Sequence, residues 1–423
     1  MVTYYEIYCR AGLRVMNPLT GILRRKARVS CPMPKNEQVT AVQPAVLKWA
    51  RESLGLTIVD VAQKLKKSPD IIQSWETGRS FPSYSQLEKL AYDIYKRPIA
   101  LFFFPKPPEE RTHRSEFRTL PDEELENLSS DTHLHIRKAH AYQLSLMEAF
   151  DERNPSDDKI WKRLELTPGK SIQRQAQMIR EFLGITLEEQ SSWSKPEIAL
   201  KKWREKIEAK GVFIFKESFK QKEISGFCLS HNEFPVIYLN NSTTSTRQIF
   251  SLLHELAHLL FQVNGITKED DDYIKNLPAK EKKLEQFCNA IAAEILIPES
   301  DFLKRCANIE GSLESLPDSF YSEIAQAYSV SREVILRKFF EYGKVTPKFY
   351  KQKSSEWSAQ MKKRGGGNWY STHASYLSST FTREVFRKYE RRVYSDTKAA
   401  ELLGIHPKNL EGLEAKLLTG ASN

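Results

Sequence analysis

Apolar residues recur at three- and four-residue steps between residues 249 and 260, a spacing that gathers side chains on one face of a helix. These positions are Ile249, Leu252, Leu253, Leu256, Leu259 and Leu260. Gly265 follows and is a suitable end to the helix. The apolar stripe leaves out His254 and His258, which fall on the opposite side with Ser251. We therefore expect an amphipathic helix whose polar side faces a cleft.

Three short runs rich in apolar and β-branched residues precede this helix, at residues 212–215, 224–229 and 236–239. Polar turns separate the runs, so they predict a small sheet. An exposed edge of that sheet can bind a peptide as an added strand, although a sheet that only covers the helix is the alternative. A second helix is expected over residues 279–298, where prolines flank the run.

The first part of the chain shows a succession of short helical segments separated by capping residues and glycines. Helices are expected at residues 47–54, at 58–65 after Thr57, at 69–76 after Ser68, and again after Pro82. Such a succession is typical of a helix-turn-helix domain.

Helical patterns also fill most of the remaining chain. Residues 122–211 are mostly helical, and residues 321–343 predict a second helix, turn and helix with Ser331 as a cap. Residues 382–394 and 396–417 predict the closing helices.

These elements predict an α+β, mostly helical protein in five segments. They are an amino-terminal extension (1–43), a helix-turn-helix domain (44–108), a helical connection (109–195), a core with the small sheet (196–318) and a basic helical region (319–423). The extension is expected to be disordered or to result from an upstream start assignment.

The helix after the sheet carries the sequence His254-Glu255-Leu256-Ala257-His258. Residues four apart share a helix face, so both imidazoles can reach one metal ion with Glu255 beside them. This arrangement suits a metal-bound water and a general base. The alternative is a coincidence on an amphipathic helix, and a third ligand is needed to decide.

A catalytic zinc site takes three protein ligands and leaves the fourth position to water. The next helix offers three carboxylates as the third ligand, Glu281, Glu285 and Glu294. Asn289 follows Glu285 by one turn, so a ligand and a polar supporting group would share one face. We therefore favour Glu285.

The two helices together resemble the ImmA/IrrE family of bacterial metallo-endopeptidases. The shared positions are Arg247-x-x-Phe250-Ser251-Leu252-x-His254-Glu255-Leu256-x-His258 and Glu285-x-x-Cys288-Asn289-x-x-Ala292-Ala293-x-Ile295-Leu296-x-Pro298. Cys288 departs from the alanine that is usual at its position, and Ile297 from the usual methionine.

This resemblance implies a zincin-like metalloprotease fold of the gluzincin type for residues 196–318. By the same resemblance His254, His258 and Glu285 bind the zinc ion, and Glu255 is the catalytic general base. We expect Asn289 and Arg247 to support these residues without taking part in the chemistry. An oxyanion donor is also expected; Tyr273 and His231 are candidates, and the spacing does not choose between them.

Residues 56–82 resemble the Cro/repressor-type (XRE) helix-turn-helix module. The shared positions are Leu56-Thr57-x-x-x-Val61-Ala62-x-x-Leu65 and Ile72-x-x-Trp75-Glu76-x-Gly78-x-x-x-Pro82. The resemblance implies that residues 68–75 form the recognition helix. The expected DNA contacts are Ser68, Gln73, Ser74 and Arg79. Ile58 replaces a usual glutamine, and Asp70 would repel phosphate, so dimerisation, protein docking or packing alone are alternatives.

Composition indicates the number of domains and the cellular compartment. A length of 423 residues, 40% of them hydrophobic, allows about three domains with ordinary cores. The five cysteines are scattered without a C-x-x-C pair, so we expect a reducing cytoplasm. The longest apolar run, residues 99–104, is too short to span a bilayer, so no membrane partner is expected.

His133, His135 and His140 are interpreted as surface or core histidines.

The net charge of +10 permits acidic partners such as nucleic acid. Residues 332–394 hold fifteen Lys or Arg against five Glu, a surplus equal to that of the whole chain. Residues 1–38 hold seven basic residues against two acids, and a basic arm on DNA is the alternative to an extension that precedes a true start near Met33 or Val39.

The ImmA/IrrE resemblance implies a zinc-dependent endopeptidase with one zinc ion per chain. It also implies a bacterial repressor, often of helix-turn-helix type, that is cleaved to derepress stress or mobile-element genes. Operator DNA and a second copy in a homodimer are further expected partners. One alternative is a non-proteolytic DNA-binding regulator or antitoxin-like protein whose zinc domain is a sensor, which would not need Glu255. Another is a structural zinc site, which usually has four protein ligands.

Overall fold

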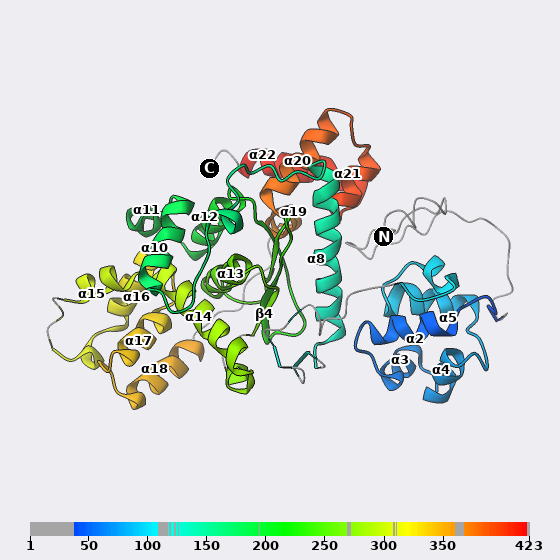
Figure 1. Cartoon of the computed structure of the whole chain (residues 1–423), viewed down its shortest axis with the longest axis horizontal. Coiled ribbons are helices and arrows are strands. Elements are labelled where there is room, and N and C mark those ends of the chain that lie inside the picture. Colours follow the sequence, from blue (N-terminus) through cyan, green and yellow to red (C-terminus); the bar gives the residue numbers. More distant parts are fainter. Residues whose placement is uncertain are drawn as a thin grey trace. The chain divides into compact units, whose positions relative to one another are not determined.

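Figure 1 shows the protein as a computed structural model. The structure describes residues 38–108, 117, 120, 121, 124, 125, 127–193, 195–268, 272–307, 309, 311–359 and 368–420. The chain divides into two compact units. The first contains the chain to residue 115 with residues 122–145 and 385–411; the second contains residues 116–121, 146–384 and 412–423. The basic segment up to residue 37 lies outside the described residues.

Short helices follow one another at the start of the first unit, as the sequence predicts (Figure 1). They are α2 (Pro44–Glu52), α3 (Ile58–Leu65), α4 (Pro69–Glu76), α5 (Tyr84–Glu88), the π-helix η1 (Lys89–Ile94) and the 3-10 helix η2 (Ile99–Phe103). The first helix begins earlier than expected because Pro44, with its fixed φ, occupies the first helical position.

Local capping produces the turn between α3 and α4. Thr57 Oγ1 accepts a hydrogen bond from Asp60 N at 3.1 Å, and the Asp60 carboxylate accepts one from Thr57 N at 2.7 Å. This capping box starts α3, which ends at Lys66 with a left-handed φ of 56°. Ser68 then caps α4 by accepting a hydrogen bond from Asp70 N at 3.3 Å. The sequence predicted both caps correctly.

The core of the helix-turn-helix domain extends further toward the amino terminus than expected. Val39 and Val42 are buried in it, and Val39 N donates a hydrogen bond to Pro82 O at 2.9 Å. Both valines fall within the expected extension of residues 1–43. The packed domain therefore begins before residue 44.

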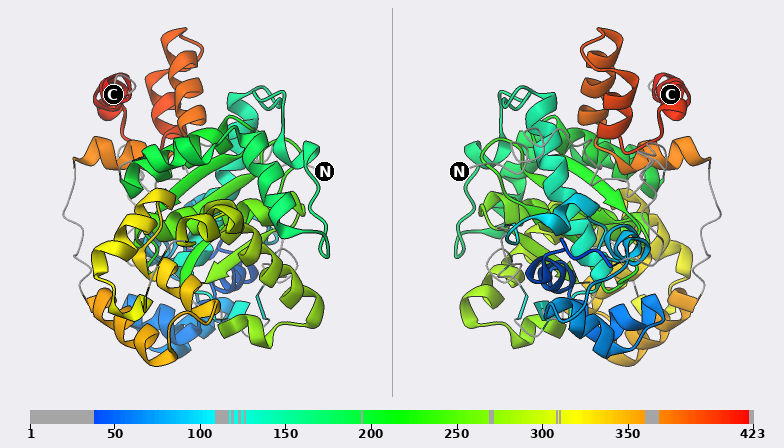
Figure 2. Two further views of the ribbon diagram at one scale, coloured as in Figure 1. Left: turned by 90° about the vertical axis from the view of Figure 1, so that its left-hand side faces the viewer. Right: turned by 90° about the vertical axis from the view of Figure 1, so that its right-hand side faces the viewer.

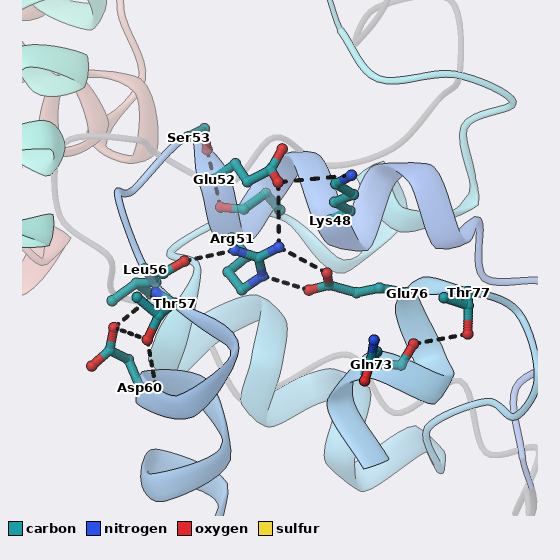
Figure 3. Close-up of polar contacts among 11 residues, drawn as sticks. Lys48, Arg51, Glu52, Ser53, Leu56, Thr57, Asp60, Gln73, Glu76 and Thr77 are labelled. Carbon is teal, nitrogen blue, oxygen red and sulfur yellow. Dashed lines mark hydrogen bonds and ion pairs between the residues drawn. The ribbon is translucent and has the colours of Figure 1, made fainter. Parts of the chain in front are cut away.

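A buried ion pair joins α2 to α4 inside this domain (Figure 3). Arg51 Nε and Nη2 donate to the two carboxylate oxygens of Glu76 at 2.7 and 2.9 Å. Arg51 Nη1 also donates to Leu56 O at 2.8 Å, at the start of the turn into α3. The two side chains are only 10% and 5% exposed, so water screens the pair weakly. Hydrogen bonding to Glu76 raises the pKa of Arg51.

Breaking this pair should destabilise the helix-turn-helix domain. Glu76→Ala leaves the buried Arg51 guanidinium with only the more exposed carboxylate of Glu52, 3.3 Å from Nη2, and losing the buried partner costs about 3–5 kcal/mol of folding free energy at most. Hydrogen–deuterium exchange of the full chain should show faster exchange in α2, α3 and α4. The double variant Arg51→Met/Glu76→Leu is the control, because replacing both charges by apolar groups restores much of the loss. Unchanged exchange in Glu76→Ala would contradict the prediction.

A four-stranded sheet lies in the second unit, with strand order β1-β3-β2-β4. The strands are β1 (Phe213–Glu217), β2 (Ile224–Leu229), β3 (Val236–Asn240) and β4 (Gly265–Lys268). β1 pairs with β3 in parallel, whereas β2 pairs with β3 and with β4 in antiparallel fashion. The sequence predicted the first three strands. It did not predict β4, which forms one edge of the sheet.

Helices α13 (Ser245–Leu260) and α14 (Ala279–Leu296) carry the two motifs of the sequence analysis. α13 packs against β2, β3 and β4, and against α12 (Pro196–Glu208) and α14 (Figure 2). Their apolar residues belong to one continuous core with β1, β2 and β3. The sheet, α12 and α14 thus all pack against α13.

Further helices complete the chain. They are α8 (Ser130–Ala149), α9 (Ile160–Arg163), α10 (Ile172–Leu183), α11 (Leu187–Ser192), η3 (Asp272–Asn276), α15 (Glu299–Cys306), η4 (Leu313–Ser315), α16 (Asp318–Tyr328), α17 (Arg332–Glu341), α18 (Pro347–Ala359), α19 (Trp369–Tyr376), α20 (Ser379–Glu390), α21 (Asp396–Leu402), η5 (Pro407–Asn409) and α22 (Leu410–Gly420). Ser331 caps α17, as predicted. Within the described ranges, none of the helices has the length and apolar character needed to cross a membrane.

Candidate functional site

The His-Glu-x-x-His sequence lies in the second half of α13. Thr244 caps this helix by accepting a hydrogen bond from Arg247 N at 3.2 Å. Ser251, His254 and His258 are fully buried. These side chains are therefore not exposed on an open helix face, and the cleft stays a prediction. Helix α14 and strand β4 cover the side of α13 that the apolar stripe leaves out.

Three side chains converge on one point between α13 and α14. His254 Nε2 and His258 Nε2 are 2.9 Å apart. His254 Nε2 lies 3.3 Å from Glu285 Oε2, and His258 Nε2 lies 3.2 Å from Glu285 Oε1. All three are fully buried, and among the described residues they form the one group whose ligand atoms converge, within 4.8 Å of one another.

The carboxylate of Glu285 is ionised despite its burial, because it pairs with the two histidines. Burial opposes ionisation of Glu285, but His258 and His254 outweigh it and lower the pKa of Glu285 to about 2. Burial also opposes the charge of His258, but Cys288 and Glu285 raise its pKa well above the usual value. Two imidazoles and one ionised carboxylate are a donor set that suits zinc. The residues present therefore fit a metal ion.

Glu255 lies beside the three converging residues and is fully buried. Its Oε1 accepts a hydrogen bond from the Thr267 hydroxyl of β4. Its Oε2 has no hydrogen-bond partner among the described residues. Thr267 thus holds one carboxylate oxygen and leaves the other without a hydrogen bond among the described residues. The sequence analysis missed Thr267 because it did not predict β4.

Gly265, the first residue of β4, is packed directly against the motif. A β-carbon at this position would lie 2.7 Å from His258 Cδ2 and 3.0 Å from Glu255 Oε2. Real carbon atoms do not approach so closely, so any larger residue must displace one of the two side chains. The sequence analysis expected only a helix end here.

Gly265→Ala should weaken metal binding and lower stability. Displacing the His258 ring should reduce zinc affinity at least about tenfold, and overpacking should cost about 1–3 kcal/mol of unfolding free energy. Chelator competition and thermal unfolding measure the two effects. Gly184→Ala is the control, because its β-carbon would meet nothing within 4 Å and its left-handed φ of 64° affects stability alone. Unchanged zinc affinity in Gly265→Ala would contradict this account.

The supporting residues predicted from the sequence occupy different places. Arg247 Nη2 donates to Lys268 O at 2.9 Å, so it ties the start of α13 to the end of β4. Asn289 is half-buried on α14. Tyr273 OH donates to Glu285 Oε2 at 3.0 Å, which places Tyr273 at the ligands. His231 instead lies after β2, where its Nδ1 accepts hydrogen bonds from Glu233 N and Phe234 N.

The expected DNA contacts lie on and beside α4. Gln73 is exposed, whereas the hydroxyl of Ser74 donates to Ile71 O at 2.8 Å. Arg79 is exposed, and its Nε donates to Thr77 Oγ1 at 3.1 Å. Ser68, the cap of α4, is exposed as well. The side chains of Gln73 and Arg79 are thus the better placed of the four for an external partner.

The fold and the two sites define a helix-turn-helix domain followed by a metallopeptidase-type domain. Family comparisons agree. Residues 47–91 match the helix-turn-helix family model, and residues 207–340 match the IrrE N-terminal-like domain, a metallopeptidase family. No match was found among curated proteins. Both resemblances are therefore confirmed for these residues: a helix-turn-helix stretch comes first in the sequence and an IrrE N-terminal-like stretch follows it.

Proposed function

We propose that the protein is a zinc-dependent endopeptidase coupled to a DNA-binding helix-turn-helix. The observation that carries this proposal is the convergence of His254, His258 and Glu285 with Glu255 beside them. In this proposal one zinc ion binds per chain at those three ligands. When bound, the ion supplies polarisation of a peptide carbonyl and a lowered pKa for the attacking water.

The protein residues carry the proton transfers. Glu255 takes the proton of the attacking water and returns it to the leaving amine. Thr267 holds Oε1 of Glu255 by its hydrogen bond, so Oε2 is the oxygen that accepts the proton. Tyr273 bonds to Glu285 and keeps that carboxylate oriented toward the two histidines.

Strand β4 is the proposed binding edge for the peptide. Its Thr267 donates a hydrogen bond to Glu255. A substrate segment held in extended form near this strand would place its backbone next to the general base. This geometry favours extended, unfolded segments of a protein over compact ones.

The proposed biological substrate is a helix-turn-helix repressor in a bacterial cytoplasm, cleaved to derepress stress or mobile-element genes. The helix-turn-helix domain supports this proposal in one of two ways. It could bind the same operator as the repressor, or it could bind the repressor's own helix-turn-helix domain directly. Homodimer formation through the same domain is part of the proposal. Gln73 and Arg79 are the first proposed DNA contacts, and Ser68 and Ser74 are the second choice.

A non-hydrolytic sensor is the second candidate, favoured by the complete burial of all four site residues. A peptide-library digestion separates the two functions. Zinc-loaded protein is incubated with peptides from a bacterial proteome, and new termini are identified by mass spectrometry. The endopeptidase predicts a defined set of internal cleavages that disappears when the metal is removed; the sensor predicts none.

A further inference from the structure

The ring of His258 is held on several sides. Its Nε2 faces His254 and Glu285, at 2.9 and 3.2 Å from their nearest atoms. On the carbon side of the ring, a β-carbon at Gly265 would lie only 2.7 Å from Cδ2, so there is no room there for a larger residue. Its Nδ1 lies 3.8 Å from the sulfur of Cys288, which is fully buried on α14.

A histidine that binds a metal through one ring nitrogen carries a proton on the other. In most metal sites a carboxylate, a backbone carbonyl or a water accepts that proton and thereby fixes the tautomer and the ring orientation. At His258 the group in this place is a thiol, whose sulfur is a weak acceptor. For the partner histidine, the Nδ1 of His254 has no hydrogen-bond partner among the described residues. Of the two histidines, only His258 therefore has a side chain at its Nδ1 among the described residues, and that side chain is Cys288.

We infer that Cys288 is a positioning residue for the metal ligand His258. Its sulfur accepts the hydrogen bond from His258 Nδ1–H, which keeps the lone pair of Nε2 directed at the metal. The inference rests on the proposed function, because it takes the three converging residues as metal ligands. It assigns a role to the residue at which this chain departs from the usual alanine.

Zinc affinity of the full chain tests the inference. Competition with a chromophoric chelator gives the affinity of wild type, Cys288→Ala, Cys288→Ser and Cys228→Ala. Removing such a hydrogen-bond partner weakens metal binding about 10- to 100-fold, and we expect Cys288→Ala near the lower end because sulfur is a weak acceptor. Cys288→Ser should recover part of the affinity, since its hydroxyl also accepts a hydrogen bond.

Cys228→Ala is the matched control. Cys228 is equally buried in the same core, but its thiol donates weakly to Val263 O at 3.7 Å and interacts with Glu255, which is not one of the three converging residues. The two alanine variants should therefore lower the melting temperature of the metal-free protein similarly, while only Cys288→Ala weakens zinc binding. Nitrogen NMR of the His258 ring in the zinc-loaded protein gives a second readout, because the shift of Nδ1–H should change in Cys288→Ala alone.

The outcomes separate this inference from the proposed function. Tight zinc binding in wild type, with weaker binding and a shifted Nδ1–H signal in Cys288→Ala, supports the positioning role. Tight binding with equal affinity in wild type and Cys288→Ala overturns the inference and leaves the proposed function standing. A wild-type protein that binds no zinc overturns both.

Discussion

Glu255→Gln should abolish peptide cleavage while the protein still binds its metal. The amide keeps the size and the Thr267 contact of Glu255 but cannot accept the proton of the attacking water. Losing a general base costs about 10²- to 10⁴-fold in rate, so cleavage should fall at least that far. The measurement is kcat/KM on a peptide from the library digestion, together with the zinc content of the same preparation.

Zinc affinity must be measured on the same variant, because only a loss of cleavage with retained zinc points to the base. Glu255 is not among the three converging ligands, so zinc affinity should stay close to that of wild type. Thr267→Val is a milder companion, because it frees Oε1 of Glu255 but leaves the carboxylate in place. It should lower the rate less than Glu255→Gln. Full cleavage by a zinc-loaded Glu255→Gln protein would refute the assignment of the base.

Glu285→Ala should remove most of the metal affinity. Glu285 contributes the carboxylate to the group, with one oxygen near each imidazole. Losing a direct ligand costs more than the roughly 10- to 100-fold loss that follows from a supporting residue, so we expect a decrease above about 100-fold. Chelator competition measures it, and cleavage should fall in parallel.

Glu281→Ala is the matched control for this prediction. Glu281 is on the same helix and was one of the three carboxylates that the sequence offered as a ligand, but it does not belong to the converging group. Its substitution should leave zinc affinity unchanged. Equal affinities of Glu285→Ala and Glu281→Ala would show that the third ligand lies elsewhere.

Local patterns predicted the helices and several of their caps. The caps at Thr57, Ser68 and Ser331, and the start of α14 after Pro278, depend on neighbours within a few residues and are visible in the sequence. The choice of Glu285 also came from helix periodicity, and the structure brings this residue to the two histidines. Features of this kind need no knowledge of distant contacts.

Contacts between distant segments were not predictable in the same way. Strand β4 spans only four residues, and it exists because it pairs with β2, about forty residues earlier in the chain. Without it, neither the Thr267 hydrogen bond nor the close approach of Gly265 could be foreseen. The same holds for the burial of His254 and His258, because covering their face requires α14 and β4 together.

Calorimetric titration of the metal-stripped protein with zinc tests the central claim most directly. The account predicts tight binding with a stoichiometry of one zinc ion per chain, because the described residues contain one converging group of ligands. It also predicts that this signal is lost in Glu285→Ala and kept in Glu255→Gln. A wild-type protein that takes up no zinc would contradict the account and leave the domain as a protease-like scaffold without a catalytic metal.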